Sequence, residues 1–206
     1  MGKKTMCAES NWYDVFSRSV ADMSSPVVLS AFFFAFVCTR FIPDAIEALK
    51  VFAVCLVAYS LLPLFFLLGA YAVKFIPDVH LYKKQDRNRA FPAIAVFYLA
   101  GLMVLYKIGA PGLIIGLAFS TTALILIIWW VNLFYKISIH MSGIAGMLVG
   151  LFFVFDAHTA TPFVPFLPLA GWVRYRNKAH SLSELAVGAI TGASVTWFVM
   201  AFLFAK

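Results

Sequence analysis

Charged side chains, above all acidic ones, are scarce in this chain of 206 residues. Asp, Glu, Lys and Arg together make up 12%, whereas hydrophobic residues make up 63% and the mean hydropathy is +0.93. Ordinary soluble domains carry about 25% charged residues, so this composition excludes a water-soluble protein. Wound as one helix, the chain would measure about 310 Å. After loops, that length allows six or seven crossings of a hydrocarbon core about 30 Å thick, so we predict a single polytopic membrane domain.

Cysteine and clustered carboxylates are also lacking. Cys7, Cys38 and Cys55 have no CxxC spacing, and two of them lie in apolar runs, which argues against a disulfide framework or a zinc site. The acidic residues are spread along the chain, and only Asp44 and Glu47 are close together. A metal-dependent prenyl- or phosphotransferase, which would hold magnesium through several carboxylates, is therefore disfavoured. We expect no metal, no other cofactor and no nucleic-acid partner.

Uncharged stretches predict the membrane spans, because a charged side chain at mid-bilayer costs about 2.5–3.5 kcal/mol. Three stretches are clearly long enough, namely 51–73, 112–135 and 185–205. Four more are shorter or contain proline, namely 26–39, 90–106, 141–155 and 157–173. No strand alternation competes with this pattern, so we predict an all-α membrane helix bundle with six or seven transmembrane helices. Gly188 and Gly192 form a pattern found where membrane helices pack closely.

The start of the chain differs from the rest. Apolar residues recur there at helical spacing, namely Trp12, Phe16, Val20 and Met23. This spacing over residues 10–23 predicts an amphipathic helix lying in the membrane interface, with a poorly ordered terminus as the alternative. No basic start leads directly into an apolar run, so we expect no cleavable signal peptide. We divide the chain into an interfacial segment, 1–25, and a transmembrane domain, 26–206.

Polar residues gather in three clusters, at 83–89, 136–140 and 174–184. Two candidate spans separate the first cluster from the second, and two more separate the second from the third. An even number of crossings returns the chain to the same side, so we expect all three clusters on one membrane face.

Positive charge favours the cytoplasm for that face. Of the 16 Lys and Arg residues, the predicted topology puts four on the opposite face, namely Arg40, Lys50, Lys107 and Lys206. The remaining twelve lie on the face of the clusters. Because cytoplasmic segments of membrane proteins are enriched in Lys and Arg, we predict that the clusters lean to the cytoplasmic side.

The clusters combine cations with two histidines at the edge of an apolar bundle, which suits an anion with a hydrocarbon tail, such as a lipid phosphate or diphosphate. In a helix, His180 and Glu184 would share one face, so the carboxylate could hold one imidazole nitrogen and leave the other as a nucleophile. His140 could act as general acid, while Lys136 and Ser138 bind phosphoryl oxygens. Asp86 either orients Arg87 or is a solvated loop charge.

These spacings resemble the type 2 phosphatidic acid phosphatase superfamily of integral-membrane lipid phosphatases. Its third motif is Ser-Arg-x5-His-x3-Asp, and Arg174, His180 and Glu184 reproduce that spacing. Val173 stands in place of the serine, and glutamate replaces the aspartate.

The other two motifs of that superfamily are matched in part. In the second, Pro-Ser-Gly-His, Ser138 and His140 match, whereas Ile137 and Ile139 replace the proline and glycine. The first motif is Lys-x6-Arg-Pro. Residues 83–92 hold lysines, arginines and a proline in that order but not at that spacing.

The resemblance implies a metal-independent phosphatase that works through a phosphohistidine. His180 would be the nucleophile, Glu184 would orient it, and His140 would be the acid. Arg174 and Ser138 would line the phosphate pocket, together with Arg89 and either Lys83 or Lys84. Arg87 is the alternative to Arg89. The expected substrate is a membrane lipid phosphate or polyprenyl phosphate, and the oligomeric state stays open. The competing hypothesis is a transporter or channel for an anionic lipid or phosphate without hydrolysis, although the long runs lack the mid-span ionisable residues expected of one.

Overall fold

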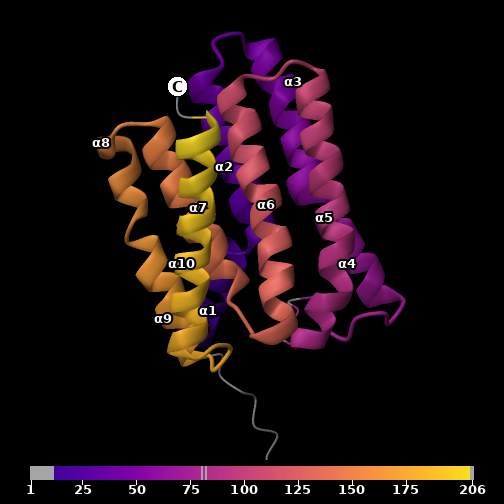
Figure 1. The fold of residues 1–206 in the computed structure, drawn as a ribbon. Coiled ribbons are helices and arrows are strands. Elements are labelled where there is room, and N and C mark those ends of the chain that lie inside the picture. Colours follow the sequence, from indigo (N-terminus) through magenta and orange to yellow (C-terminus); the bar gives the residue numbers. More distant parts are fainter. Residues whose placement is uncertain (1–11, 80, 82, 205–206) are drawn as a thin grey trace, which may run out of the picture.

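A computed structural model of the chain describes residues 12–79, 81 and 83–204, and all the regular structure in these residues is helical (Figure 1). The first half contains α1 (Trp12–Met23), α2 (Pro26–Phe41), α3 (Ala45–Leu56) and α4 (Leu62–Ala72). The second half contains α5 (Lys84–Lys107), α6 (Gly112–Phe134), α7 (Ile139–Val154), α8 (Ala157–Ala160), α9 (Phe166–Arg176) and α10 (Leu182–Val199). The predicted all-α helix bundle is therefore confirmed.

Four helical segments in the described part of the chain are long and apolar enough to cross a membrane. They are Ala45–Ala72, Lys84–Lys107, Gly112–Phe134 and Leu182–Phe202. A fifth results if α1 and α2, which are bent by 56° relative to each other, form one broken span. Because α7 and α9 are shorter than these, the total of six or seven crossings stays a prediction.

Local sequence explains where two of the predicted spans differ from the helices. The run 51–73 belongs to a longer helical segment, because Asp44 caps α3 by accepting a hydrogen bond from the Glu47 backbone N–H at 2.7 Å. A π-helical turn, Val57–Leu61, joins α3 to α4. The run 157–173 is not one helix. Prolines interrupt it, so α8 passes through a 3-10 turn, Thr161–Phe163, before α9 begins.

In Figure 1, α5, α7 and α10 run upward, whereas α6 and α9 run downward. The connections before α5, between α6 and α7, and between α9 and α10 consequently lie together at the lower end. Those connections carry the three polar clusters, so the clusters share one end of the bundle, as the parity of the spans predicts. Which side of a membrane this end faces stays a prediction.

Close packing of α10 against α7 aligns two of the three clusters. A Cβ added to Gly188 would lie 2.6 Å from the backbone oxygen of Ser138, and one added to Gly192 would overlap the backbone of Ser142. Only glycine permits this approach. The packing pattern predicted from the two glycines is therefore confirmed, and it holds the start of α7 against the start of α10.

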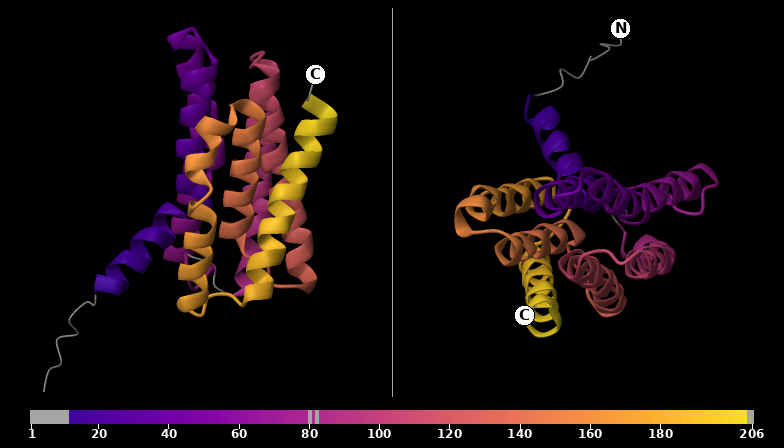
Figure 2. Two further views of the ribbon diagram at one scale, coloured as in Figure 1. Left: turned by 90° about the vertical axis from the view of Figure 1, so that its left-hand side faces the viewer. Right: turned by 90° about the horizontal axis from the view of Figure 1, so that it is seen from above.

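The predicted N-terminal helix is present over Trp12–Met23, while residues 10 and 11 lie outside the described part. It extends obliquely from the lower end of the bundle (Figure 2). Val20 and Ser17 are buried, whereas the large apolar side chains of Trp12, Phe16 and Met23 are exposed. An exposed apolar face on a helix at the polar end suits the membrane interface.

Candidate functional site

Side chains from all three polar clusters meet at the lower end of the bundle. Arg87, in the first turn of α5, donates hydrogen bonds through Nη1 to the Ile137 carbonyl at 2.5 Å and through Nη2 to Nε2 of His180 at 3.3 Å. Lys136 donates to the Ala179 carbonyl at 2.8 Å. The bond from Arg87 to His180 joins residues that are 93 positions apart in the sequence. Together these bonds unite the three clusters in one site.

His180 and Glu184 form the predicted hydrogen bond, but the assumption that both lie in one helix is wrong, because α10 begins at Leu182 and His180 precedes its N-cap, Ser181. Nδ1 of His180 lies 2.7 Å from Oε2 of Glu184. The same oxygen accepts the backbone N–H of Ser181 at 3.3 Å, and the Ser181 hydroxyl accepts the Glu184 N–H, which makes a capping box at the start of α10. The Glu184 carboxylate therefore has two roles: it binds the His180 imidazole, and it caps the start of α10.

The proton of His180 lies on Nδ1. A guanidinium can only donate hydrogen bonds, so the Arg87 contact requires a lone pair on Nε2. Burial is the largest cause that lowers the pKa of His180, to about 4, and the positive charge of Arg87 is the next. Arg174 and Lys136 lower it further by smaller amounts, whereas the hydrogen bond to Glu184 acts in the opposite direction. Although His180 and Glu184 are close enough for an ion pair, the imidazole is neutral at pH 7 and its Nε2 is a free base.

Arg87 is held firmly in this position. Its Nε donates to the Leu81 carbonyl at 2.7 Å, and only 1% of the residue is exposed. Leu81 has a positive φ of 53°, an uncommon conformation for a branched residue. The chain thus turns sharply before α5 and presents a carbonyl to the guanidinium.

The end of α9 turns the chain back so that His180 faces Arg174. The Ala179 N–H bonds to the Arg174 carbonyl and the Lys178 N–H to the Tyr175 carbonyl, the two bonds of a Schellman motif. Lys178 takes the left-handed conformation, with φ of 53°, that this motif requires. Two residues later His180 lies within reach of the Arg174 charge.

Helix register places His140 and Arg174 at the same level. Ile144 of α7 and Ala170 of α9 belong to one buried cluster. The two helices are antiparallel (Figure 1), so one turn toward the polar end leads from Ile144 to His140 and from Ala170 to Arg174. Both residues are buried, with Arg174 only 3% exposed. A second histidine and a second arginine therefore share the site's end of the bundle.

Ser138 and Lys136 both contact Glu184, the first at its backbone and the second at its carboxylate. The Ser138 N–H donates to the backbone carbonyl of Glu184 at 3.2 Å, while its hydroxyl caps α7 by accepting the Met141 N–H at 3.4 Å. Nζ of Lys136 lies 3.9 Å from Oε2 of Glu184. Lys136 is thus one of the cations around His180, and Ser138 fixes the junction of α7 with α10.

Three of the predicted phosphate-binding residues are not brought to His180. Arg89 is exposed and donates to the Phe75 carbonyl at 3.4 Å, away from the cluster. Lys83 is exposed, and Lys84 uses its carbonyl to accept a hydrogen bond from Asn132. Of the two arginines in the first motif, the structure brings Arg87 to the site. Asp86 is buried in α5, so its description as a solvated loop charge is wrong.

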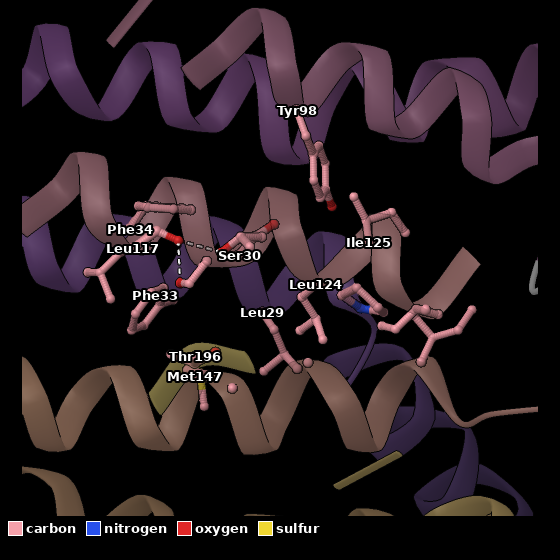
Figure 3. Close-up of a pocket in the computed structure, with 17 residues that line it drawn as sticks. Leu29, Ser30, Phe33, Phe34, Tyr98, Leu117, Leu124, Ile125, Met147 and Thr196 are labelled. Carbon is pink, nitrogen blue, oxygen red and sulfur yellow. Dashed lines mark hydrogen bonds between the residues drawn. The ribbon is translucent and has the colours of Figure 1, made fainter. Parts of the chain in front are cut away.

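An apolar cavity begins beside the site and runs into the bundle between α2, α6 and α7 (Figure 3). It encloses about 680 Å³ including its open mouth, and residues from five helices line it. Sequence reasoning missed this cavity, because no local pattern marks residues that meet only across several helices. Cys38 and Cys55, which lie in apolar runs of the sequence, are both buried in the core as free thiols.

Among the described residues there is no group of three or more His, Cys, Asp or Glu side chains that could hold a metal ion. Comparison with models of protein families, with curated proteins and with solved structures finds no match to this chain. The function must therefore be argued from the geometry of the site itself.

Proposed function

We propose that this protein is an integral-membrane phosphatase that hydrolyses a lipid or isoprenoid phosphate or diphosphate through a phosphohistidine, without a metal. One observation carries the proposal: His180 is neutral, has its Nδ1 proton bound by Glu184, and directs Nε2 into a cluster of cations. An oriented base in an anion-attracting pocket is what a histidine nucleophile requires. The resemblance of the motifs to the type 2 phosphatidic acid phosphatase superfamily supports the same reaction.

Arg87, Arg174 and Lys136 would bind the phosphate. Arg87 donates a hydrogen bond to Nε2 of His180. A phosphate offers that guanidinium an anionic acceptor with several oxygens, which can take two parallel hydrogen bonds where the neutral imidazole takes one. Arg87 would therefore turn to the phosphate oxygens and leave the Nε2 lone pair free. The cations would then stabilise the charge that develops on the transferred group.

The reaction would take two displacements. Nε2 of His180 attacks phosphorus, the bond from phosphorus to the lipid oxygen breaks, and protonated His140 gives that oxygen its proton. Water then attacks the phosphorus of the phosphohistidine while neutral His140 accepts a proton from the water. The phosphorus–nitrogen bond breaks, inorganic phosphate leaves, and both histidines return to their first states. Glu184 holds the Nδ1 proton throughout.

The site end of the bundle would face the cytoplasm, since twelve of the 16 Lys and Arg residues lie on that side in the predicted topology. Four helical segments long and apolar enough to cross a membrane support an integral membrane protein. A lipid phosphate with its head at the bilayer edge would meet His180 without leaving the membrane.

The test is phosphate release from dodecyl phosphate by purified protein, with a chelator present throughout. His180→Ala should lower the rate by about 10⁴-fold or more, as loss of a nucleophile does in other hydrolases. His158→Ala is the matched control, because this histidine is exposed on α8 at the other end of the bundle, and its rate should equal that of the wild type.

Normal turnover by His180→Ala would refute the nucleophile, and loss of the wild-type rate on chelation would refute the metal-independent reaction. Anion flux into liposomes by wild type and His180→Ala alike, with no phosphate released, would instead support the transporter.

A further inference from the structure

The apolar cavity begins at the site's end of the bundle and runs into its interior. Its lower end, called the mouth below, is lined by Pro26 and Ile139, the first residues of α2 and α7. Ile139 lies between Ser138 and His140 in the chain, and two residues from Ile137, whose carbonyl binds Arg87. The mouth of the cavity therefore lies at the same end of the bundle as the cationic site.

The other end of the cavity is closed by aromatic and branched side chains. Phe33 of α2 and Leu117 of α6 line this end, and both pack against Gly150 of α7. Between the mouth and this end, the lining passes from Ile139 to Met147, eight residues of helix or about 12 Å along the bundle axis. The cavity is thus elongated and closed at one end.

The wall of the cavity suits hydrocarbon better than a polar group. None of the described residues that line it is charged. The hydroxyls of Ser120 and Thr121 both donate to the Leu117 carbonyl at 2.8 Å, and the Ser30 hydroxyl donates to the Tyr59 carbonyl at 2.9 Å. Because their protons are used within the bundle, these side chains offer no donor to an anion, and Figure 3 shows apolar side chains such as Leu29 and Leu124 directed into the space.

We propose that this cavity binds one hydrocarbon chain of the lipid phosphate whose head is held by Arg87, Arg174 and Lys136, and that its closed end selects chain length. The inference rests on the proposed function for the position of the head. Charge complementarity places the anion at the mouth, and the apolar wall takes the chain that follows it.

Gly143 allows the cavity to be filled without disturbing the fold. It lines the cavity, and a Cβ added there would meet no atom within 4 Å, so a larger side chain can extend into the space. Gly69 on α4 is the matched control, because a Cβ there also meets nothing, while the residue is exposed and does not line the cavity. Gly143→Ala fills less of the space than Gly143→Leu and guards against a folding defect in the larger variant.

The experiment measures binding of dodecylphosphonate and butylphosphonate, which carry the anionic head but are not hydrolysed. Comparing variants in the same detergent cancels partition into micelles. Gly143→Leu should weaken dodecylphosphonate binding at least tenfold and leave butylphosphonate unchanged, with a smaller loss in Gly143→Ala and none in Gly69→Leu. Unchanged dodecylphosphonate binding in both Gly143 variants, or an equal loss for the two ligands, would overturn the inference. Chain-selective binding by a protein that releases no phosphate from dodecyl phosphate would retain the cavity and refute the phosphatase.

Discussion

Replacing Arg87 by glutamine removes the cation nearest to the reactive nitrogen of His180. A unit charge about 4–5 Å away contributes at most about 4 kcal/mol at an effective dielectric constant of about 20. That energy would move a pKa by about 3, but burial is the larger cause of the low pKa of His180 and remains in the variant. Arg174 and Lys136 also remain. Loss of Arg87 should therefore raise the pKa of His180 above its value of about 4, by no more than the upper bound of about 3, and burial should still hold it down.

The direction of the effect on activity follows from the role of the imidazole. The nucleophile must be neutral, so phosphate release falls as the pH drops through the pKa of His180. Raising this pKa moves the acid limb of the pH–rate profile of Arg87→Gln to higher pH by the same amount, whatever the loss in absolute rate. A histidine NMR titration, with the His180 signal assigned by its loss in His180→Gln, measures the same shift without reliance on turnover.

Arg89→Gln is the matched control for Arg87→Gln. The two arginines are two residues apart, yet Arg89 is exposed and bonds to the Phe75 carbonyl rather than to His180. Its loss should leave the titration of His180 and the acid limb where they are in the wild type. Equal shifts in the two variants, or no shift in Arg87→Gln, would show that Arg87 does not act on His180 as described.

Two further predictions concern the acid and the frame of the site. His140→Gln should slow hydrolysis of dodecyl phosphate at least tenfold more than hydrolysis of 4-nitrophenyl phosphate. The reason is that the alkoxide leaving group needs a proton, whereas the activated aryl leaving group does not. Equal slowing of the two substrates would exclude His140 as the acid. Gly192→Ala should destabilise the fold by about 1–3 kcal/mol through overpacking against Ser142, which would lower the Tm in detergent. Gly69→Ala should leave the Tm unchanged. An unchanged Tm in Gly192→Ala would contradict the close contact of α7 and α10.

The coarse fold was predictable because membrane insertion is governed by properties that are local in sequence. A charge in the middle of a span is costly, so apolar runs and polar clusters alternate with the crossings. The parity of those runs was enough to bring the three clusters to one end. The proline-rich run 157–173 was less predictable, since a broken helix can still lead the chain from one end of the bundle to the other. There the structure has α8, a 3-10 turn and α9 in place of one helix.

Within the site, the local interactions could be predicted and the distant ones could not. His180 precedes Ser181, the N-cap of α10, and Glu184 is the third residue of the helix. The capping box turns the Glu184 carboxylate back over the helix start, so local cap geometry holds it beside His180. The partners of Arg87 are 6, 50 and 93 residues away. No spacing rule reaches that far.

Arg87 and Arg89 show why sequence alone could not choose between the two cations. In a helix they point about 160° apart, so at most one can face the junction of α7 with α10. That junction is fixed by Gly188 and Gly192, which bring α10 onto α7 at a distance that no larger residue permits. The contact of Arg87 with Ile137 and His180 therefore depends on the junction of α7 with α10, and it should weaken in any variant that separates these two helices.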